Sequence, residues 1–574
     1  MGGLLDTLDV PGPLTEHEQE VVTGFERGHR IKLRPNTPIR PELIRALCVH
    51  AASAPAGRAA GLRIEGAAIP GRIDLEGLDI PFPLRLRRCT LGQLVITDAR
   101  LVSLSLAGST CTGVTAGRVS VTGSMRLNAG FAATGRVWMP GASIGGDFDC
   151  TSAQLGTENE NAALLLDGTH IAGRVFLRGG ETRLGKSDTH RWFEVCGRVR
   201  AMNARFDRGL ICTPHARFAH EDGIAVELYA LRTNGWATFT GAEIHGGLQI
   251  ATGHIGGQLT LASATIMGEL DLEAVEIDGN LNLSDTELGP RTTIRGSRIA
   301  GSADFTRAWA GYSREIDAAG STIGGRLVWK DVKYEPKSAE GPPFMPSVSV
   351  AHAQAAVLDD DPGAWPRGHN LTLEGFSYRG LDIPGDLGVG PRSSLARLRR
   401  HRPEGWLGAR IDWLLSQPCD RWSPYPYGQL AAALRQAGHD SAARVVSIER
   451  ERQRRHRGGL NRASKLANRI VGLTIGYGYR PWIALVWAAI VMAVGAAVFS
   501  HLHPRDFTIK DNPPVYHPLG YSIDAFLPIV NLHQEDARTP KALGWSIYLW
   551  IHIALGWLLT TLGIAGVTGL IRRE

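Results

Sequence analysis

The residues best suited to chemistry lie in one short segment, Tyr521 to Asp536, which reads YSIDAFLPIVNLHQED. The segment is amphipathic and rich in turn-forming residues, with Asp524 able to cap a helix and Pro528 interrupting the pattern. Carboxylates, amides and backbone carbonyls are the groups from which ion-selective filters are built, usually as rings contributed by several subunits. The candidate pore-loop residues are Asp524, Asn531, His533, Glu535 and Asp536.

Two interpretations of this segment are open. A short helix followed by polar residues between two apolar runs is the layout of a pore loop, although the T-V-G-Y-G sequence of potassium filters is missing. An interfacial helix followed by a structural loop explains the same residues equally well.

Other candidate groups are weaker. His552 falls inside an apolar run, where an ionisable residue usually faces a bundle interior; simple packing against a neighbouring helix is the alternative. The chain has no G-x-G-x-x-G fingerprint between a strand and a helix, no P-loop, no G-x-S-x-G elbow and no H-E-x-x-H pair. We therefore predict no catalytic residue, no cofactor and no metal. Four further residues have side chains that can bind a metal ion, but their spacing is too unspecific to predict a site: His215, His220, Glu221 and Asp222.

Two apolar runs flank the candidate segment, at residues 482–500 and 543–571, and neither contains Asp, Glu, Lys or Arg. Each is long enough to cross a hydrocarbon core of about 30 Å as a helix. Basic residues before the first run and after the second predict cytoplasmic termini and an external loop at residues 501–541. Tryptophans that suit the two membrane interfaces are Trp482, Trp487, Trp545 and Trp550.

Basic residues are concentrated just before the first apolar run. Residues 450–480 contain nine Arg or Lys and a single acid, Glu451. Because this block adjoins a predicted span, anionic lipid at the cytosolic face is a nearer partner than nucleic acid, which we do not expect to bind. The predicted lipid-facing residues are Arg454, Arg455, Arg457, Arg462, Lys465 and Arg469.

An internal repeat accounts for most of the remaining chain. Between Ala242 and Phe305 the pattern I-x-G-x-L-x-L returns every eleven residues, with aliphatic residues at offsets 0, 4 and 6. Offsets 4 and 6 share one face of a strand, whereas on a helix the third position would lie far from the first two. The recurring glycines suit bends between short strands. The predicted fold class is mainly β: an elongated β-solenoid with helical caps and a C-terminal two-helix transmembrane module. Two repeat units in one coil would give about 22 residues per coil, but the sequence leaves the coil size open.

The sequence predicts four successive parts of the chain. In the first part, Thr15 and Glu18 predict a capping box at the first helix. The longest loop insertion is expected at Lys333–Pro366, and its acidic run Asp359–Asp361 is expected to be solvated. The predicted parts are a helical N-terminal cap (1–60), a β-solenoid with loop insertions (61–390), a helical cap with a basic linker (391–480) and a transmembrane module (481–574).

Four sequence motifs point to a family: GHDSAAR (438–444), YGYRPW (477–482), YSIDAFLP (521–528) and GWLLTTLGIAG (556–566). Together with the repeat, they resemble actinobacterial membrane proteins commonly labelled "membrane-associated oxidoreductase", and the similarity covers most of the chain. The resemblance implies a bacterial plasma-membrane location and a redox cofactor, for which the chain has no recognisable binding motif. The last hundred residues are similar to a two-span pore-loop channel in layout only.

Two functions of different classes follow from these features. The first is an integral membrane protein whose cytosolic solenoid is a binding or oligomerisation platform, coupled to a pore-loop-like ion pathway in a homo-oligomer. The second, implied by the resemblance alone, is a membrane-associated oxidoreductase. The missing catalytic and cofactor motifs favour the first.

Overall fold

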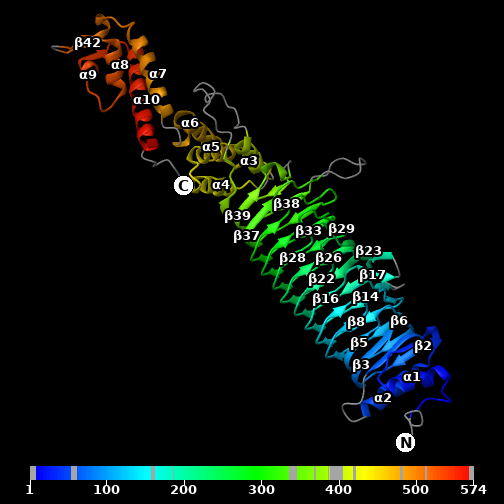
Figure 1. Cartoon of the computed structure of the whole chain (residues 1–574). Helices are drawn as coiled ribbons and strands as arrows, with labels where there is room; N and C mark the ends of the chain where they lie inside the picture. Colours follow the sequence, from blue (N-terminus) through cyan, green and yellow to red (C-terminus); the bar gives the residue numbers. More distant parts are fainter. Residues whose placement is uncertain are drawn as a thin grey trace. The chain divides into compact units, whose positions relative to one another are not determined.

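The chain forms two compact units, Met1–Pro418 and Cys419–Glu574. Figure 1 traces both in a computed structural model. The residues that the structure describes are 8–53, 61–156, 162–184, 187–334, 346–366, 370–385, 387, 405–417, 422–478, 482–510 and 513–567.

The first unit is a parallel β-solenoid of about 13 turns, which confirms the predicted fold class. Its strands run from β2 (Leu62–Asp74) to β41 (Ser377–Leu381), and most contain only two residues. In the regular part, Ile244 in β26 (Glu243–Gln249) pairs with Ile266 in β29 (Thr265–Ile266), 22 residues later. One coil therefore consists of two repeat units, a coil size that the sequence alone had left open.

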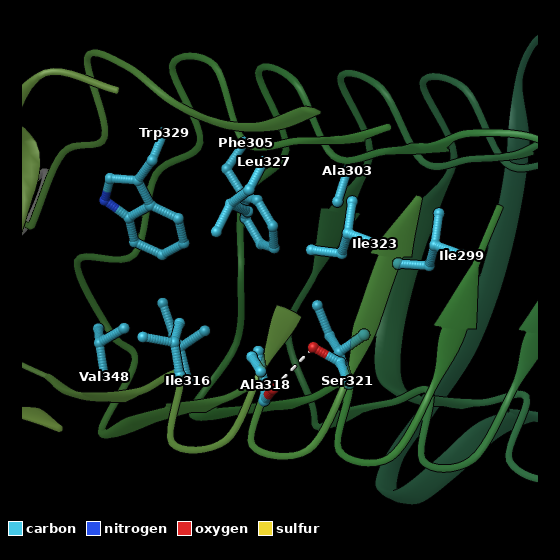
Figure 2. A pocket seen from close by; sticks show the side chains of 13 residues that line it. Ile299, Ala303, Phe305, Ile316, Ala318, Ser321, Ile323, Leu327, Trp329 and Val348 are labelled. Atoms are coloured by element: carbon cyan, nitrogen blue, oxygen red, sulfur yellow. Dashed lines mark hydrogen bonds between the residues drawn. The ribbon is translucent and has the colours of Figure 1, made fainter. Parts of the chain in front are cut away.

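The repeated aliphatic side chains fill the interior of this column. Ile244, Leu248 and Ile250, at offsets 0, 4 and 6, are all fully buried, and the same positions are buried in the following coils. Each such side chain contributes roughly 1.5–3 kcal/mol when it leaves water. Figure 2 shows the interior near Phe305 and Trp329, where the remaining cavity of about 10 Å³ is lined almost entirely by apolar side chains and is no larger than one water molecule. The column is a packed core rather than a ligand channel.

The recurring glycines sit where one coil touches the next. A Cβ on Gly268 would lie 2.3 Å from the backbone of Gly246, and one on Gly289 would lie 1.9 Å from the carbonyl oxygen of Gly268. The glycines thus mark bends, as expected. The main reason that glycine is required there is the close approach of neighbouring coils, rather than an unusual φ. Left-handed φ occurs instead once per repeat at another corner, at Thr252, Ser263 and Ala274 (φ 56°, 56° and 54°).

The N-terminal cap consists of α1 (Glu16–Glu26), β1 (Ile31–Pro38) and α2 (Pro41–Ser53). The predicted capping box is present: Glu18 N donates to Thr15 Oγ1 at 3.3 Å and Thr15 N donates to Glu18 Oε2 at 3.0 Å. Strand β1 was not predicted. It pairs in parallel with β2 and so covers the first exposed edge of the column, with Ile31 and Leu33 buried in alternation.

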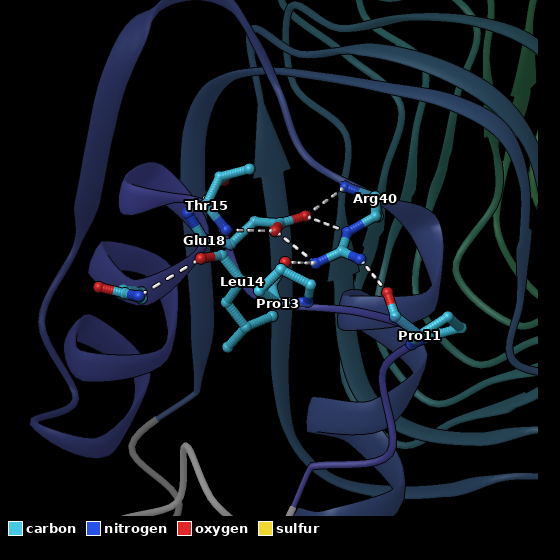
Figure 3. A network of polar contacts seen from close by, with 7 residues as sticks. Pro11, Pro13, Leu14, Thr15, Glu18 and Arg40 are labelled. Atoms are coloured by element: carbon cyan, nitrogen blue, oxygen red, sulfur yellow. Dashed lines mark hydrogen bonds and ion pairs between the residues drawn. The ribbon is translucent and has the colours of Figure 1, made fainter.

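Glu18 of α1 also connects two segments of the N-terminal cap through its contacts with Arg40. Arg40 donates from Nε to Oε1 at 2.8 Å and from Nη2 to Oε2 at 2.7 Å (Figure 3). Burial alone would raise the pKa of Glu18, but the hydrogen bonds from Arg40 and Thr15 outweigh it and hold the pKa at about 2. The carboxylate is therefore a charged structural group at neutral pH.

The C-terminal end of the solenoid differs from expectation. The segment Lys333–Pro366, expected as one loop, contains the solenoid strands β38 (Ser347–Ser349) and β39 (Gln354–Asp360). The expectation that the acidic run Asp359–Asp361 is solvated holds for Asp361, which is exposed, and is wrong for Asp359 and Asp360. Asp359 is almost fully buried and pairs with Lys330 and with Arg326, whose Nη1 lies 3.4 Å away.

Asp360 forms a fully buried ion pair with Arg410 of α3 (Gly405–Leu415). Arg410 donates from Nη2 to Oδ1 at 2.6 Å and from Nη1 to Oδ2 at 2.9 Å, and Trp365 Nε1 donates to Oδ2 at 2.6 Å. The guanidinium lies 4.9 Å from the ring centroid of Trp413, and Trp365 stacks on Trp329 at 4.6 Å. Helix α3 is held on the last coils by one charged pair inside an aromatic cluster.

Within the described residues, the second unit is helical apart from one short antiparallel pair of strands. Its apolar helices α7 (Trp482–Phe499) and α10 (Leu543–Val567) are long and apolar enough to cross a membrane, by length and composition. The other elements are α4 (Tyr425–Gln436), α5 (Asp440–Arg457), α6 (Arg462–Ile475), η4 (Gly476–Gly478), η5 (Pro504–Asp506), β42 (Phe507–Ile509), α8 (Pro518–Phe526), α9 (Gln534–Ala537) and β43 (Arg538–Pro540).

We expect Arg410→Met to destabilise the solenoid unit by about 3–5 kcal/mol, because it leaves the Asp360 carboxylate buried without a counter-ion. The matched control is Arg307→Gln, which breaks an exposed pair with Asp285 and is expected to leave the stability almost unchanged, because solvent screens the pair. Thermal unfolding of the full-length protein, followed by the β signal in circular dichroism, measures both. Equal melting temperatures for Arg410→Met and the wild type would contradict the structural role.

Candidate membrane module

The core of the second unit forms where α7, α8 and α10 meet. Phe499 at the end of α7 contacts Tyr521 of α8 and Tyr548 of α10, with ring centroids 4.8 and 5.5 Å apart. Further members of this core are Leu502, Phe507, Ala525 and Leu549. The loop between the two apolar runs is thus a folded part of the module.

Two glycines allow α8 to approach both long helices. A Cβ on Gly495 of α7 would lie 2.4 Å from Ser522 Oγ and 2.5 Å from His552 Cε1. A Cβ on Gly556 of α10 would lie 2.0 Å from the carbonyl oxygen of Phe526, the last residue of α8. Neither glycine was identified from the sequence, although each interrupts a run of larger apolar residues.

His552 lies in the interior between α10 and α8. Its Nε2 is 3.1 Å from both the hydroxyl and the carbonyl oxygen of Ser522. A carbonyl only accepts, so this geometry requires the proton on Nε2. The Ser522 hydroxyl in turn donates to the Met492 carbonyl at 2.8 Å. One histidine and one serine therefore join three helices through hydrogen bonds.

Asp524 is engaged within its own loop. Its Oδ1 accepts from Leu532 N at 2.5 Å, and its Oδ2 accepts from Gln534 N at 2.7 Å and Glu535 N at 2.8 Å. Three backbone N–H groups thus donate to one carboxylate. These hydrogen bonds fix the conformation of the segment between α8 and α9 and the start of α9. In this conformation Asp524 is a structural acceptor rather than a free ligand.

The other candidate residues have different surroundings. Asn531 is exposed and its Oδ1 accepts from His533 N at 2.9 Å, while His533 adopts a left-handed φ of 57°. Glu535 is partly buried; burial, then the charges of Asp536 and Asp524, raise its pKa. The structure brings Glu535 close to Asp524 and leaves Asn531, His533 and Asp536 on the surface.

The loop also exposes apolar side chains. Ile529 is 80% exposed, and Val530 and Leu532 are also exposed. The base of the loop is closed by β42 and β43, which pair antiparallel from Phe507↔Pro540 to Ile509↔Arg538. The surface of the loop around residues 529–536 therefore mixes apolar and polar side chains.

The predicted lipid-facing basic residues, five arginines and one lysine, fall into two groups. Arg454 of α5 lies 3.6 Å from Glu451, and Arg455 donates to the Tyr477 hydroxyl at 3.4 Å. Arg457 is partly buried. The three basic residues of α6 are all exposed: Arg462, Lys465 and Arg469.

The possible metal group is only partly described. The His215 ring packs against Trp192 at 5.1 Å, and the side chains of Glu221 and Asp222 lie outside the described residues. Within the described part of the chain, no group of three or more His, Cys, Asp or Glu side chains is arranged to hold a metal ion. The prediction of no metal stays a prediction.

No protein family, curated protein or solved structure matches this chain. The resemblance to actinobacterial membrane proteins thus stays a prediction. The function has to be argued from the geometry of the chain itself.

We expect Asp524→Ala to loosen the segment after α8, because three backbone N–H groups lose a charged acceptor worth about 1.5–3 kcal/mol per bond. Hydrogen–deuterium exchange of the full-length protein in lipid nanodiscs should show several-fold faster exchange at Leu532, Gln534 and Glu535. Asp536→Ala, which removes an exposed carboxylate nearby, is the control and should leave these amides unchanged. Unchanged exchange in Asp524→Ala would contradict the assigned role.

Proposed function

We propose that this chain is a two-pass integral membrane protein whose β-solenoid is a cytosolic binding or oligomerisation platform. The observation that carries the proposal is the exposed apolar surface of α7 and α10. Leu485 of α7 is 72% exposed and Trp550 of α10 is 61% exposed. Apolar surface in water costs about 25 cal/mol per Å², so helices of this kind need an apolar environment around them.

A bilayer fits this surface better than a soluble partner does. At about 100° per residue, the exposed side chains of α7 cover more than half of its circumference. A helix buried in a soluble core would hide most of its side chains, but only 17% of α7 and 22% of the apolar window in α10 are buried. Lipid surrounds a helix on all free sides, as this exposure requires.

The proposed orientation follows from charge. Basic residues of α5 and α6 precede α7, and Arg572 and Arg573 follow α10, which supports a cytoplasmic side for both termini by the positive-inside rule. The folded loop 501–541 is then external. In a bacterial cell this membrane is the plasma membrane.

The platform role of the solenoid is supported by its rigid, repetitive surface. Glu194, Arg217 and Glu243 occupy one outward position on three successive coils, with Arg217 Nη1 3.5 Å from Glu194 and its Nε 2.8 Å from Glu243. Hairpin β17 (Gly180–Leu184) and β18 (Ser187–Arg191) adds an antiparallel pair outside the main sheet. A repeated surface of this kind suits an extended protein partner.

A second candidate function is an ion pathway. Its support is the position of α8, which packs against both apolar helices through Gly495 and Gly556 and leads into the polar residues of the loop. Two spans cannot enclose a pore, so this candidate requires a homo-oligomer. The oxidoreductase implied by the resemblance would instead be favoured by a flavin, haem or nicotinamide absorbance that copurifies in stoichiometric amount.

We expect the full-length protein, expressed in bacteria, to remain in the membrane pellet after alkaline carbonate washing and to need detergent for release. Leu485→Asp combined with Ile490→Asp places two charges on the exposed apolar face of α7 and should reduce the integrated fraction strongly. The control carries Val102→Asp and Met267→Asp, two exposed apolar positions on the solenoid. Wild-type protein in the carbonate supernatant would refute the proposal.

If the loop forms an ion pathway, proteoliposomes containing the protein should conduct, and Asn531→Ala or Glu535→Ala should change the rate or ion selectivity. Lys510→Ala, an exposed basic residue outside the segment Tyr521–Asp536, is the control. Flux that is absent, or that neither loop variant alters, would eliminate this second function and leave the membrane anchor standing.

A further inference from the structure

Helix α6 presents two different stripes to its surroundings. Its basic residues recur at spacings of three and four, which places them along one face of a helix. Three exposed aliphatic residues form a second stripe beside the first. The basic stripe is Arg462, Lys465 and Arg469, and the aliphatic stripe is Leu466, Ile470 and Leu473.

The positive charge of α6 is uncompensated in its surroundings. The sequence contains no Asp or Glu from Arg452 to Arg505. Within the described residues, no ion pair involves the three α6 cations. The arginines of α5 differ, because Arg452 lies 3.3 Å from Glu449 and Arg454 lies 3.6 Å from Glu451. Of these two helices, and within the described residues, only α6 combines cations that form no ion pair with an exposed apolar stripe.

Helix α6 is also fixed beside the first turns of α7. The indole Nε1 of Trp487 donates to the Leu473 carbonyl at 3.1 Å. The Tyr477 hydroxyl donates to Asn468 Oδ1 at 3.2 Å, and Gly476 ends the helix in a left-handed conformation. The two stripes thus lie close to the point at which the chain enters its first apolar helix.

We infer that α6 is an in-plane interfacial helix that binds anionic phospholipid headgroups. This inference rests on the proposed membrane function and adds to it the site and chemical class of the lipid. The aliphatic stripe enters the headgroup–acyl boundary, and the three cations bind the phosphate oxygens of neighbouring lipids. Arginine suits this role because its planar guanidinium donates two parallel hydrogen bonds to a phosphate. The α5 arginines, already paired or bonded to Tyr477, position α6 rather than bind lipid.

The test compares variants of the full-length protein in membranes that contain equal amounts of phosphatidylglycerol and phosphatidylethanolamine. After extraction into polymer-bounded discs, mass spectrometry measures the ratio of the two lipids that remain with the protein. The wild type is expected to enrich phosphatidylglycerol several-fold, and high salt should reduce the enrichment. Arg462→Gln, Lys465→Gln and Arg469→Gln together should bring the ratio close to that of the bulk membrane.

Two controls make the outcome decisive. Arg174→Gln, Arg208→Gln and Arg298→Gln remove the same charge from exposed solenoid positions and should leave the enrichment unchanged. Arg462→Lys with Arg469→Lys keeps the charge and should retain most of it, which guards against a folding defect in the triple variant. A wild type without enrichment, a triple variant that retains it, or enrichment abolished by added inorganic phosphate would overturn the inference. Carbonate washing of the same samples reports membrane integration separately, so failure here is distinguishable from failure of the proposed function.

Discussion

The first unit depends on contact between successive coils at the fixed spacing of hydrogen-bonded strands, about 4.8 Å. At that spacing one corner of the coil has no room for a side chain, since a Cβ on Gly289 would lie 1.9 Å from the Gly268 carbonyl oxygen. The same spacing stacks aliphatic residues such as Ile244 and Ile266 into a continuous core. Glycine outside and aliphatic side chains inside are thus two results of one geometry, and this is why both recur every eleven residues.

A stacked column has two exposed strand edges, and the two ends of this solenoid close them by different means. At the N-terminus β1 adds one more parallel strand, and the charged Glu18–Arg40 pair holds the covering helix in place. At the C-terminus α3 is attached through the buried Asp360–Arg410 pair. A buried ion pair adds little to the free energy of folding compared with apolar packing, but it permits few alternative arrangements of its partners. We interpret it as fixing the position of α3 on the last coils.

The features that the sequence predicted well depend on residues that are close together in the chain. The eleven-residue repeat, the Thr15–Glu18 capping box and the two apolar helices are all visible as local periodicity or local composition. The missed features depend on distant partners. The partner of Asp360 lies 50 residues away, so an acidic run looks solvated when read alone. Gly495 and Gly556 matter because α8 packs against them, and no pattern within either helix reveals that contact.

The polar groups of the membrane module are satisfied from within. Ser522 and His552 bond each other, Tyr521 donates to the Arg538 carbonyl, and Asp524 accepts from its own loop. What remains on the surface of α7 and α10 is almost entirely apolar, so those helices cannot distinguish one lipid headgroup from another. Under the proposed membrane function, any preference for a lipid class would come from the ends of the module. At one end, α6 carries three exposed cations that form no ion pair within the described residues. The proposal therefore assigns lipid selectivity to α6 and membrane anchorage to α7 and α10, and mutation can separate the two.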